Sequence, residues 1–383
     1  MRERPWLILL PVLLLGGCTG FVARQITHPG HQTIGRQFEE VLTSQGLRRE
    51  ALATAEGVRI AYWVVPPRAY QVSEQVKRTE HDGRLTAFAI HFKFGADDPA
   101  RLPLLPAKGS VLLLHPWGVG GTAMLPWALK YAEAGYVVVV PDLRSQGGSG
   151  DAPVGYGPRE AADVVDLAGQ LREAGRLPGP LFVMGASYGA TVALFAASGL
   201  PQLRGVLALE PYANAADTIR RAPASGLFGH RRLARWISPR EVDAAIERAS
   251  DQLGVDLATV DAGEALAASP VCTLVVRGAN DRLMPAAALR ALSARSPRAR
   301  YVEVPGENHL SLPISVDRLL APSIAWMQSV PADAGQACPE LAPLPRGAVN
   351  PATASPVAHS SASAPAPTAA PAPAARAPAT GAR

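Results

Sequence analysis

Apolar and polar positions follow two alternating patterns along the chain from about residue 57 onward. Short continuous apolar runs are followed by stretches in which apolar residues recur at helical spacing, as in YVVVVPD and then EAADVVDLAGQLREAG. Continuous apolar runs of this kind suit strands that are buried on both faces, and the helices supply the crossovers that parallel strands need. The pattern predicts an α/β fold with a mostly parallel central sheet and flanking helices.

Two segments near the start of this region predict strands of a different kind. EGVRIAYWVV and RLTAFAIHFKF are rich in β-branched and aromatic residues, which is typical of strands. They precede the regular alternation, so we expect the sheet to have an antiparallel start and a parallel remainder. The predicted catalytic or binding domain spans residues 57–330.

A helical excursion separates the apolar run that ends near Glu210 from the run that begins near Val271. Within it, Ser238-Pro-Arg-Glu241 combines a capping serine, a proline at the first helical position and a glutamate three residues after the serine. Together these features indicate the start of a helix. Because an insertion after a parallel strand lies at the carboxyl edge of the sheet, we predict a lid over about residues 212–268. A passive surface excursion is the alternative.

The two ends of the chain differ in composition from the middle. The amino terminus carries positive charge in MRER, an apolar run in PWLILLPVLLL and small residues after it, as secretory signals do. The apolar run is about ten residues, too short to span a bilayer comfortably. Residues 331–383 are rich in proline and alanine, and SPVAHSSASAPAPTAAPAPAARAPATGAR has no bulky apolar residue beyond one valine. We predict a disordered tail, either a tether or a passive extension.

Leu15-Gly-Gly-Cys18 resembles the lipobox of bacterial lipoproteins. The resemblance implies a signal peptide over residues 1–17, a lipid on Cys18 that attaches the chain to a membrane, and a tether and amino-terminal segment over residues 18–56. It also implies a location in the cell envelope. With Thr19 second in the mature chain, that location is the outer membrane facing the periplasm if the cell is Gram-negative. The alternative is an ordinary signal peptide or uncleaved anchor whose cysteine is incidental.

Charge and cysteine content limit which partners and which kinds of site the sequence supports. The net charge is +5 and the basic residues are scattered, so a nucleic-acid partner is not expected. The three cysteines, Cys18, Cys272 and Cys338, have neither metal-ligand nor redox spacing, which argues against zinc and against a disulfide scaffold. Cys272, in PVCTLVVRG, is expected to be a small buried residue, with a Cys272–Cys338 bridge as the alternative outside the cytosol. No metal or organic cofactor is expected.

The stretch LFVMGASYGA carries the clearest candidate chemistry. Gly185-Ala-Ser187-Tyr-Gly189 fits Gly-x-Ser-x-Gly between a predicted strand and a predicted helix, the context of a nucleophile elbow. The serine backbone is strained in such a turn, and a Cβ at either neighbouring glycine would collide with it. The sequence therefore predicts Ser187 as a nucleophile, which needs a histidine base oriented by a carboxylate.

The partners of the serine are predicted from the strands that follow it. Asp281 comes after CTLVVRGAN and His309 after YVEVPGEN. Since parallel strands all end at one edge, both residues are expected beside Ser187 in the chain order that the elbow requires. Glu210, at the end of VLALE, is the alternative acid; it is otherwise a lid or substrate contact, or the cap of a turn.

An oxyanion hole needs two donors near the nucleophile. The backbone N–H of Tyr188, the residue after the serine, is the first candidate. The second is the N–H of Trp117, in His115-Pro-Trp-Gly118 after the run VLLL. This loop is similar to the His-Gly-x-Gly segment of α/β-hydrolases, with a proline in place of the first glycine. Proline has no N–H, but Trp117 retains one.

Residues 57–330 resemble bacterial α/β-hydrolases of the serine esterase and serine aminopeptidase-like group. PDLRSQGGS is similar to the family loop after the fourth strand, in which Asp142 and Arg144 are expected to brace the loops; AND281RLMP and GENH309 resemble the acid and histidine loops. The resemblance implies a serine hydrolase that cleaves an ester or related acyl bond of a small molecule. A serine peptidase of the same fold and a non-catalytic binding lipoprotein are the alternatives.

Overall fold

The computed structural model describes residues 19–32, 39–40, 42–43, 46–81, 84–93, 102–225, 237–333 and 335–344. All of them belong to one compact unit. The predicted signal peptide, Cys18 and the tail from residue 345 onward lie outside the described residues. Among the residues described, no helix is long and apolar enough to cross a bilayer.

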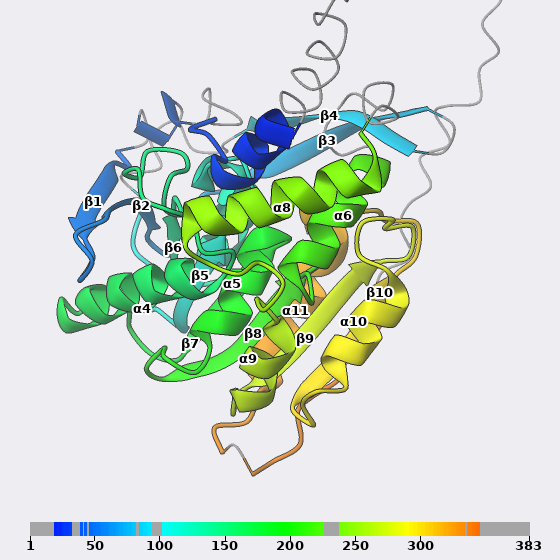
Figure 1. The fold of residues 1–383 in the computed structure, drawn as a ribbon. Helices are drawn as coiled ribbons and strands as arrows, with labels where there is room; N and C mark the ends of the chain where they lie inside the picture. Colours follow the sequence, from blue (N-terminus) through cyan, green and yellow to red (C-terminus); the bar gives the residue numbers. More distant parts are fainter. Residues whose placement is uncertain are drawn as a thin grey trace, which may run out of the picture. The chain divides into compact units, whose positions relative to one another are not determined.

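An eight-stranded sheet forms the centre of this unit, in the order β1-β2-β6-β5-β7-β8-β9-β10 (Figure 1). Only β2 runs against its neighbours, because it pairs antiparallel with both β1 and β6, and the remaining pairs are parallel. The predicted α/β fold with a mostly parallel sheet is confirmed. The strands are β1 (Arg49–Ala53), β2 (Arg59–Val65), β5 (Gly109–Leu114), β6 (Tyr136–Pro141), β7 (Leu181–Ala186), β8 (Leu203–Leu209), β9 (Cys272–Gly278) and β10 (Ala299–Val304).

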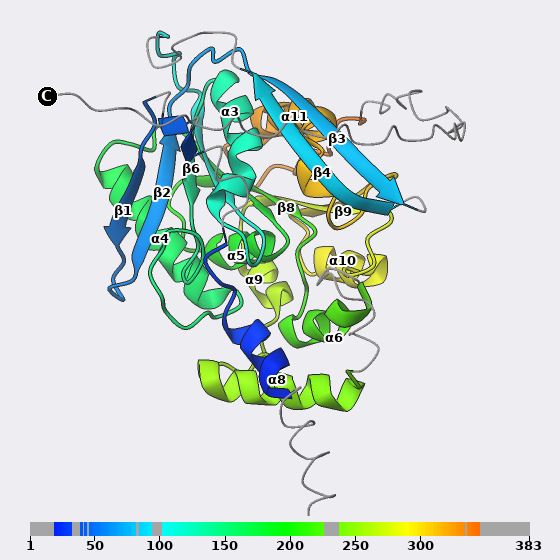
Figure 2. The same ribbon diagram turned by 90° about the horizontal axis from the view of Figure 1, so that it is seen from above.

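Helices cover both faces of the sheet (Figures 1 and 2). Successive residues of a buried strand pack on opposite sides of it. In β7, Val183 packs with the cluster beneath α4, α5, α9 and α10, whereas Met184 packs with the cluster beneath α3 and α11. This alternation is why β6 and β7 are apolar at every position. The covering helices are α3 (Leu125–Glu133), α4 (Pro158–Glu173), α5 (Tyr188–Ala196), α9 (Ala262–Ala268), α10 (Ala286–Ser293) and α11 (Val316–Ser329).

The antiparallel elements differ from the expectation. The predicted strand EGVRIAYWVV becomes β2, whereas RLTAFAIHFKF becomes β4 (Arg84–Lys93), which pairs with β3 (Ser73–His81) in a separate two-stranded sheet. The antiparallel start of the main sheet is completed instead by β1, REALA. This short edge strand has no continuous apolar run, so its sequence gives little signal.

The insertion forms α6 (Ala215–Ser225), α8 (Pro239–Leu253) and α9, and residues 226–236 lie outside the described part. As expected, α8 begins after Ser238, whose hydroxyl accepts from the Glu241 N–H at 3.3 Å while the Glu241 carboxylate accepts from the Ser238 N–H at 2.6 Å. Figure 1 shows α6 beyond the tip of the β9 arrow, with α8 beside it. Helix α9 instead packs beside α5 and α10.

The segment predicted as an amino-terminal tether is packed against the domain over residues 19–27, which form a helix beside α8 (Figures 1 and 2). Ala23 and Ile26 of this helix are buried in the core. The Tyr156 hydroxyl donates to the Ile26 carbonyl at 2.8 Å. Val22 packs against the same core cluster. The short segment carries no sequence signal that predicts this packing, so the difference from a free tether is seen only in the structure.

Cys272 and Cys338 form a disulfide bond, with their Cα atoms 5.4 Å apart. The expectation that Cys272 is an unpaired buried residue is therefore wrong. The bond closes a loop with a sequence separation of 66, which by loop entropy alone stabilises the fold by about 4 kcal/mol.

The disulfide also places chain beyond the predicted domain end at residue 330. Cys338 is buried, and the Trp326 indole N–H donates to the Pro339 carbonyl at 3.0 Å. Leu341 and Leu344 pack against the core cluster on the α11 side. The folded domain thus continues through residue 344, because a covalent bond and a few contacts hold a segment whose composition alone suggests disorder.

Candidate active site

Ser187 lies at the turn between β7 and α5 with φ 52° and ψ −113°. A non-glycine residue at positive φ costs about 1–3 kcal/mol and persists only where its surroundings enforce it. The flanking glycines make the turn possible. A Cβ on Gly185 would lie 2.2 Å from the Gly189 carbonyl oxygen, and one on Gly189 would lie 2.3 Å from that of Leu114. The expected strained elbow is present, but the atoms nearest to such a Cβ belong to the backbones of Gly189 and Leu114 and not to that of Ser187.

His309 connects the serine to a carboxylate. Its Nε2 lies 2.9 Å from the Ser187 Oγ, and its Nδ1 lies 2.9 Å from the Asp281 Oδ2. Asp281 follows β9 and His309 follows β10. The parallel strands thereby bring His309 to the same edge as Ser187, which lies 122 positions earlier in the sequence, and Asp281, which lies 28 positions earlier. The structure thus brings together all three residues that the sequence proposed, in the order in which a proton can pass from serine to histidine.

Asp281 is held as an anion. Its Oδ1 accepts from the backbone N–H groups of Leu283 at 2.7 Å and Met284 at 3.0 Å. Burial by itself raises the pKa of this carboxyl, but the hydrogen bond and charge of His309 and the two N–H groups outweigh burial and hold the pKa below its ordinary value. An ionised Asp281 favours the histidine tautomer with its proton on Nδ1.

Glu210 lies at the same imidazole. It follows β8, its residue exposure is 0%, and its Oε2 is 3.4 Å from the His309 Nδ1. Its Oε1 accepts from the Gly278 N–H at 3.1 Å. Burial first, and then the charge of Asp281, raise the pKa of Glu210 well above its ordinary value. Burial argues against a direct substrate contact by Glu210 in this conformation, whereas its contacts fit both a role beside His309 and a cap on the Gly278 N–H at the end of β9.

The two candidate oxyanion donors are neighbours. Tyr188 is the first residue of α5, where backbone N–H groups have no acceptor within the helix. Trp117 lies on the loop after β5, and its ring centroid is 4.8 Å from that of Tyr188. The helix N-terminus adds the positive end of its dipole at this point. The Trp117 ring therefore packs against that of Tyr188, the residue that follows Ser187.

The loop that carries Trp117 is fixed despite its proline. The buried His115 imidazole accepts at Nε2 from the Leu143 N–H at 2.9 Å, which leaves Nδ1 to donate to the Pro116 carbonyl at 2.8 Å. Burial lowers the pKa of His115, with the charge of Asp142 opposing it, and a neutral ring suits this pair of bonds. The Gly118 N–H donates to the Gln146 Oε1 at 2.8 Å.

Asp142 and Arg144 brace the loops as expected. The Asp142 carboxylate accepts from the N–H groups of Gly121 at 2.5 Å and Gly148 at 2.8 Å, which joins two loops at the sheet edge. The Arg144 guanidinium donates twice to Asp163, at 2.6 and 2.8 Å. Both side chains are almost fully buried. Neither belongs to the group of side chains around His309, which consists of Ser187, Asp281 and Glu210.

Glu307 is a further bracing residue, and no motif in the sequence marks it. Glu307, two residues before His309, is 2% exposed and accepts from Arg318 of α11 at 2.7 Å and from Arg78 of β3 at 3.2 Å. Burial alone raises the pKa of Glu307, but Ser311 and the two guanidinium groups hold it below its ordinary value. The separate β3–β4 hairpin is thereby attached to the histidine loop.

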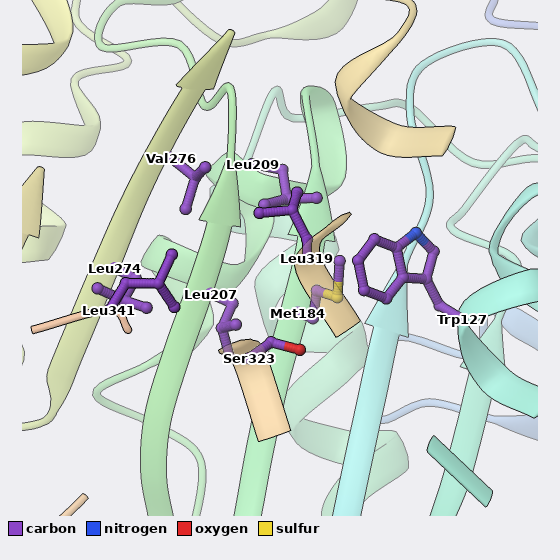
Figure 3. Close-up of a pocket in the computed structure, with 9 residues that line it drawn as sticks. All are labelled: Trp127, Met184, Leu207, Leu209, Leu274, Val276, Leu319, Ser323 and Leu341. Atoms are coloured by element: carbon purple, nitrogen blue, oxygen red, sulfur yellow. The ribbon is translucent and has the colours of Figure 1, made fainter. Parts of the chain in front are cut away.

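A small cavity on the other face of the sheet is unrelated to this site. Its volume is about 10 Å³, and its apolar walls include Met184 of β7, Leu207 of β8 and Leu319 of α11 (Figure 3). That volume is near the lower limit for a single water molecule. The cavity is a packing defect beneath α11 and has no room for a substrate.

A serine elbow at the carboxyl edge of a mostly parallel sheet, joined to a histidine after the last strand, is the arrangement of an α/β hydrolase. The sequence model of the Alpha/beta hydrolase family matches residues 111–321, more than half of the chain. The protein belongs to that family. None of the curated proteins matches the chain by sequence.

Solved structures share the fold at low sequence identity. An esterase from Pyrococcus furiosus is 16% identical, with a TM-score of 0.54 over 79% of this chain and 96% of its own. The α/β hydrolase GrgF from Penicillium sp. sh18 is also 16% identical, with a TM-score of 0.51 over 75% of this chain and 99% of its own. Similarity at this level shows a shared fold. A substrate class has to be inferred from the active-site residues of this protein.

Proposed function

We propose that this protein is a serine hydrolase that cleaves an ester or related acyl bond of a small molecule. The observation that carries the proposal is the pair of 2.9 Å contacts that His309 makes with Ser187 and Asp281. Membership of the α/β hydrolase family and the esterase among the similar structures agree with it. No step of the proposed chemistry uses a cofactor.

In the proposed mechanism the Ser187 Oγ attacks the substrate carbonyl carbon while its proton passes to the Nε2 of His309. The Tyr188 and Trp117 N–H groups stabilise the oxyanion, and Asp281 stabilises the imidazolium. Collapse of the tetrahedral intermediate expels the alcohol, which takes the proton from Nε2. Water then attacks the acyl-enzyme with His309 as base, releasing the acid and restoring the Ser187 hydroxyl.

The nature of the scissile bond is tested by comparing nitrophenyl esters of short acids with amino-acid anilides. We expect turnover of the esters at a kcat/KM at least about a hundredfold above that of the anilides, since the ester leaving group needs less protonation by His309. The Ser187→Ala variant gives the background for both series. Exclusive cleavage of anilides would favour the peptidase alternative.

We further propose that the enzyme resides in the cell envelope, with a lipid on Cys18, and faces the periplasm from the outer membrane if the cell is Gram-negative. The Cys272–Cys338 disulfide supports an oxidising compartment. The first described residue of the packed helix, Thr19, is next to Cys18 in the sequence, so such a lipid would hold the domain close to the bilayer. Mass spectrometry of the mature amino terminus tests this proposal, and a chain that starts elsewhere or lacks acylation contradicts it.

A further inference from the structure

The ends of two neighbouring strands carry strained residues that face one imidazole. Ser187 after β7 has φ 52°, and Glu210 after β8 has φ 54°. Both side chains approach His309, Ser187 at Nε2 and Glu210 at Nδ1. Backbone strain at a non-glycine residue indicates a position that the site requires. The nucleophile elbow explains the strained backbone at Ser187, but it does not explain the strained backbone at Glu210.

The neighbouring strand is built to admit the Glu210 carboxyl. Gly278 at the end of β9 donates its N–H to the Glu210 Oε1, and a Cβ at this position would lie 2.9 Å from that oxygen. The same Cβ would lie 2.6 Å from the Glu307 carbonyl oxygen. The Glu210 N–H in turn donates to the Val276 carbonyl at 2.7 Å. A side chain at residue 278 would therefore displace either the carboxyl or the histidine loop.

The charges around Glu210 leave room for one anion. The charged or titratable groups that face it are Asp281, His309 and Arg277. The Arg277 guanidinium is occupied by the carbonyls of Met284 at 2.7 Å and Asp281 at 2.6 Å. Ligating atoms of Glu210, Asp281 and His309 all lie within 4.8 Å of one another. Two buried carboxylate charges at such a separation repel each other, so the ionisation of one disfavours the ionisation of the other.

The hydrogen bonds decide which carboxyl carries a proton. Asp281 accepts from two backbone N–H groups and from His309, all at 3.0 Å or less. Glu210 accepts from a single N–H, at 3.1 Å, and its Oε2 has no hydrogen-bond donor in the described structure. Hydrogen bonds to the ionised form stabilise it, so Asp281 keeps the charge and Glu210 keeps the proton.

We propose that Glu210 is a positioning residue: a protonated carboxyl that donates to Asp281, so that the pair presents a single negative charge to the Nδ1–H of His309. The catalytic part of this inference rests on the proposed hydrolase function, whereas the protonation state does not. During turnover Glu210 keeps its proton, and the proton from Ser187 stays on His309 until the leaving group takes it. Glu210 limits the freedom of Asp281 and of the ring.

The protonation state is tested by the pH dependence of stability, which needs no substrate. Since the pKa of Glu210 is raised in the folded state, its favourable contribution is complete below about pH 4.5 and is lost as the pH rises toward the folded-state value. We expect the folding equilibrium constant of Glu210→Gln, divided by that of the wild type, to rise about tenfold per pH unit in that range.

The control for this measurement is Glu264→Gln, which removes an exposed carboxyl from α9, and its ratio to the wild type is expected to stay constant. Infrared spectra provide a second readout. The wild type is expected to show the C=O stretch of a protonated carboxyl near neutral pH, and Glu210→Gln to lack it. A ratio that does not change with pH, together with no loss of the carboxyl band, overturns the inference.

The positioning role is tested by kinetics on an ester that the wild type cleaves. Because Glu210 lies behind His309 and is fully buried, Glu210→Ala is expected to lower kcat about a hundredfold while KM changes little. Glu210→Gln keeps a donor toward Asp281 and is expected to recover most of this loss. Equal losses in both variants, or a change confined to KM, contradict positioning. A wild type without hydrolysis would refute the proposed function and leave the stability result intact.

Discussion

Ser187→Ala is expected to lower kcat for a cleaved ester by about 10⁶-fold, and His309→Ala by a similar factor. The reason is that the nucleophile and its base act as one unit, with 2.9 Å between the Ser187 Oγ and the His309 Nε2. The double variant is therefore expected to be no slower than either single variant. Initial rates, corrected for the hydrolysis that occurs without enzyme, give kcat for the two single variants and the double variant.

Ser329→Ala is the control for this series. Ser329 is an exposed residue of α11, and its replacement is expected to leave kcat unchanged. Circular dichroism of each variant separates loss of chemistry from loss of fold. Retention of most of the activity in Ser187→Ala, or a multiplicative loss in the double variant, contradicts the account of Ser187 and His309 as nucleophile and base.

Asp281→Asn is expected to give the second large loss. An amide at this place can donate to Nδ1 and so favours the wrong tautomer of His309, which costs about 10⁴-fold in kcat where no other carboxyl is present. In this protein Glu210 lies 3.4 Å from the same Nδ1. Once the charge of Asp281 is removed, Glu210 ionises more readily and replaces it in part. The expected loss is therefore about 10²–10³-fold.

The double variant Asp281→Asn/Glu210→Gln separates this explanation from a general tolerance of the site. It removes both carboxylates and is expected to show the full loss of about 10⁴-fold. Rates at saturating substrate measure the effect on kcat. A double variant that is no slower than Asp281→Asn would mean that Glu210 gives no support, whereas a normal rate in Asp281→Asn would remove Asp281 from the mechanism.

The positions of Ser187, Asp281 and His309 were predictable because their signals are local or follow from strand direction. The elbow is a five-residue pattern between a strand and a helix. Asp281 and His309 each follow a buried strand, and parallel strands end at one edge whatever the details of packing. The bracing role of Asp142 and Arg144 was likewise predictable from a loop sequence.

The features that the sequence left undecided or did not indicate depend on residues that are distant along the chain. Arg78 meets Glu307 across 229 residues, and the disulfide joins cysteines with a separation of 66. In neither pair does the spacing along the sequence indicate that the two residues are in contact. The position of Glu210 beneath His309 depends on the register of β8 with β9 and on the missing side chain of Gly278, which cannot be seen from a glutamate at a strand end.

The claim on which all the chemistry depends is that the Ser187 hydroxyl is an activated nucleophile, and covalent labelling tests it most directly. Folded protein is treated with a fluorophosphonate, and the modified peptide is identified by mass spectrometry. We expect a single phosphonylated residue, Ser187, with labelling lost in Ser187→Ala. A folded wild type that does not react would point to a binding protein on a hydrolase fold, and labelling that persists in Ser187→Ala would assign the reactive group to another residue.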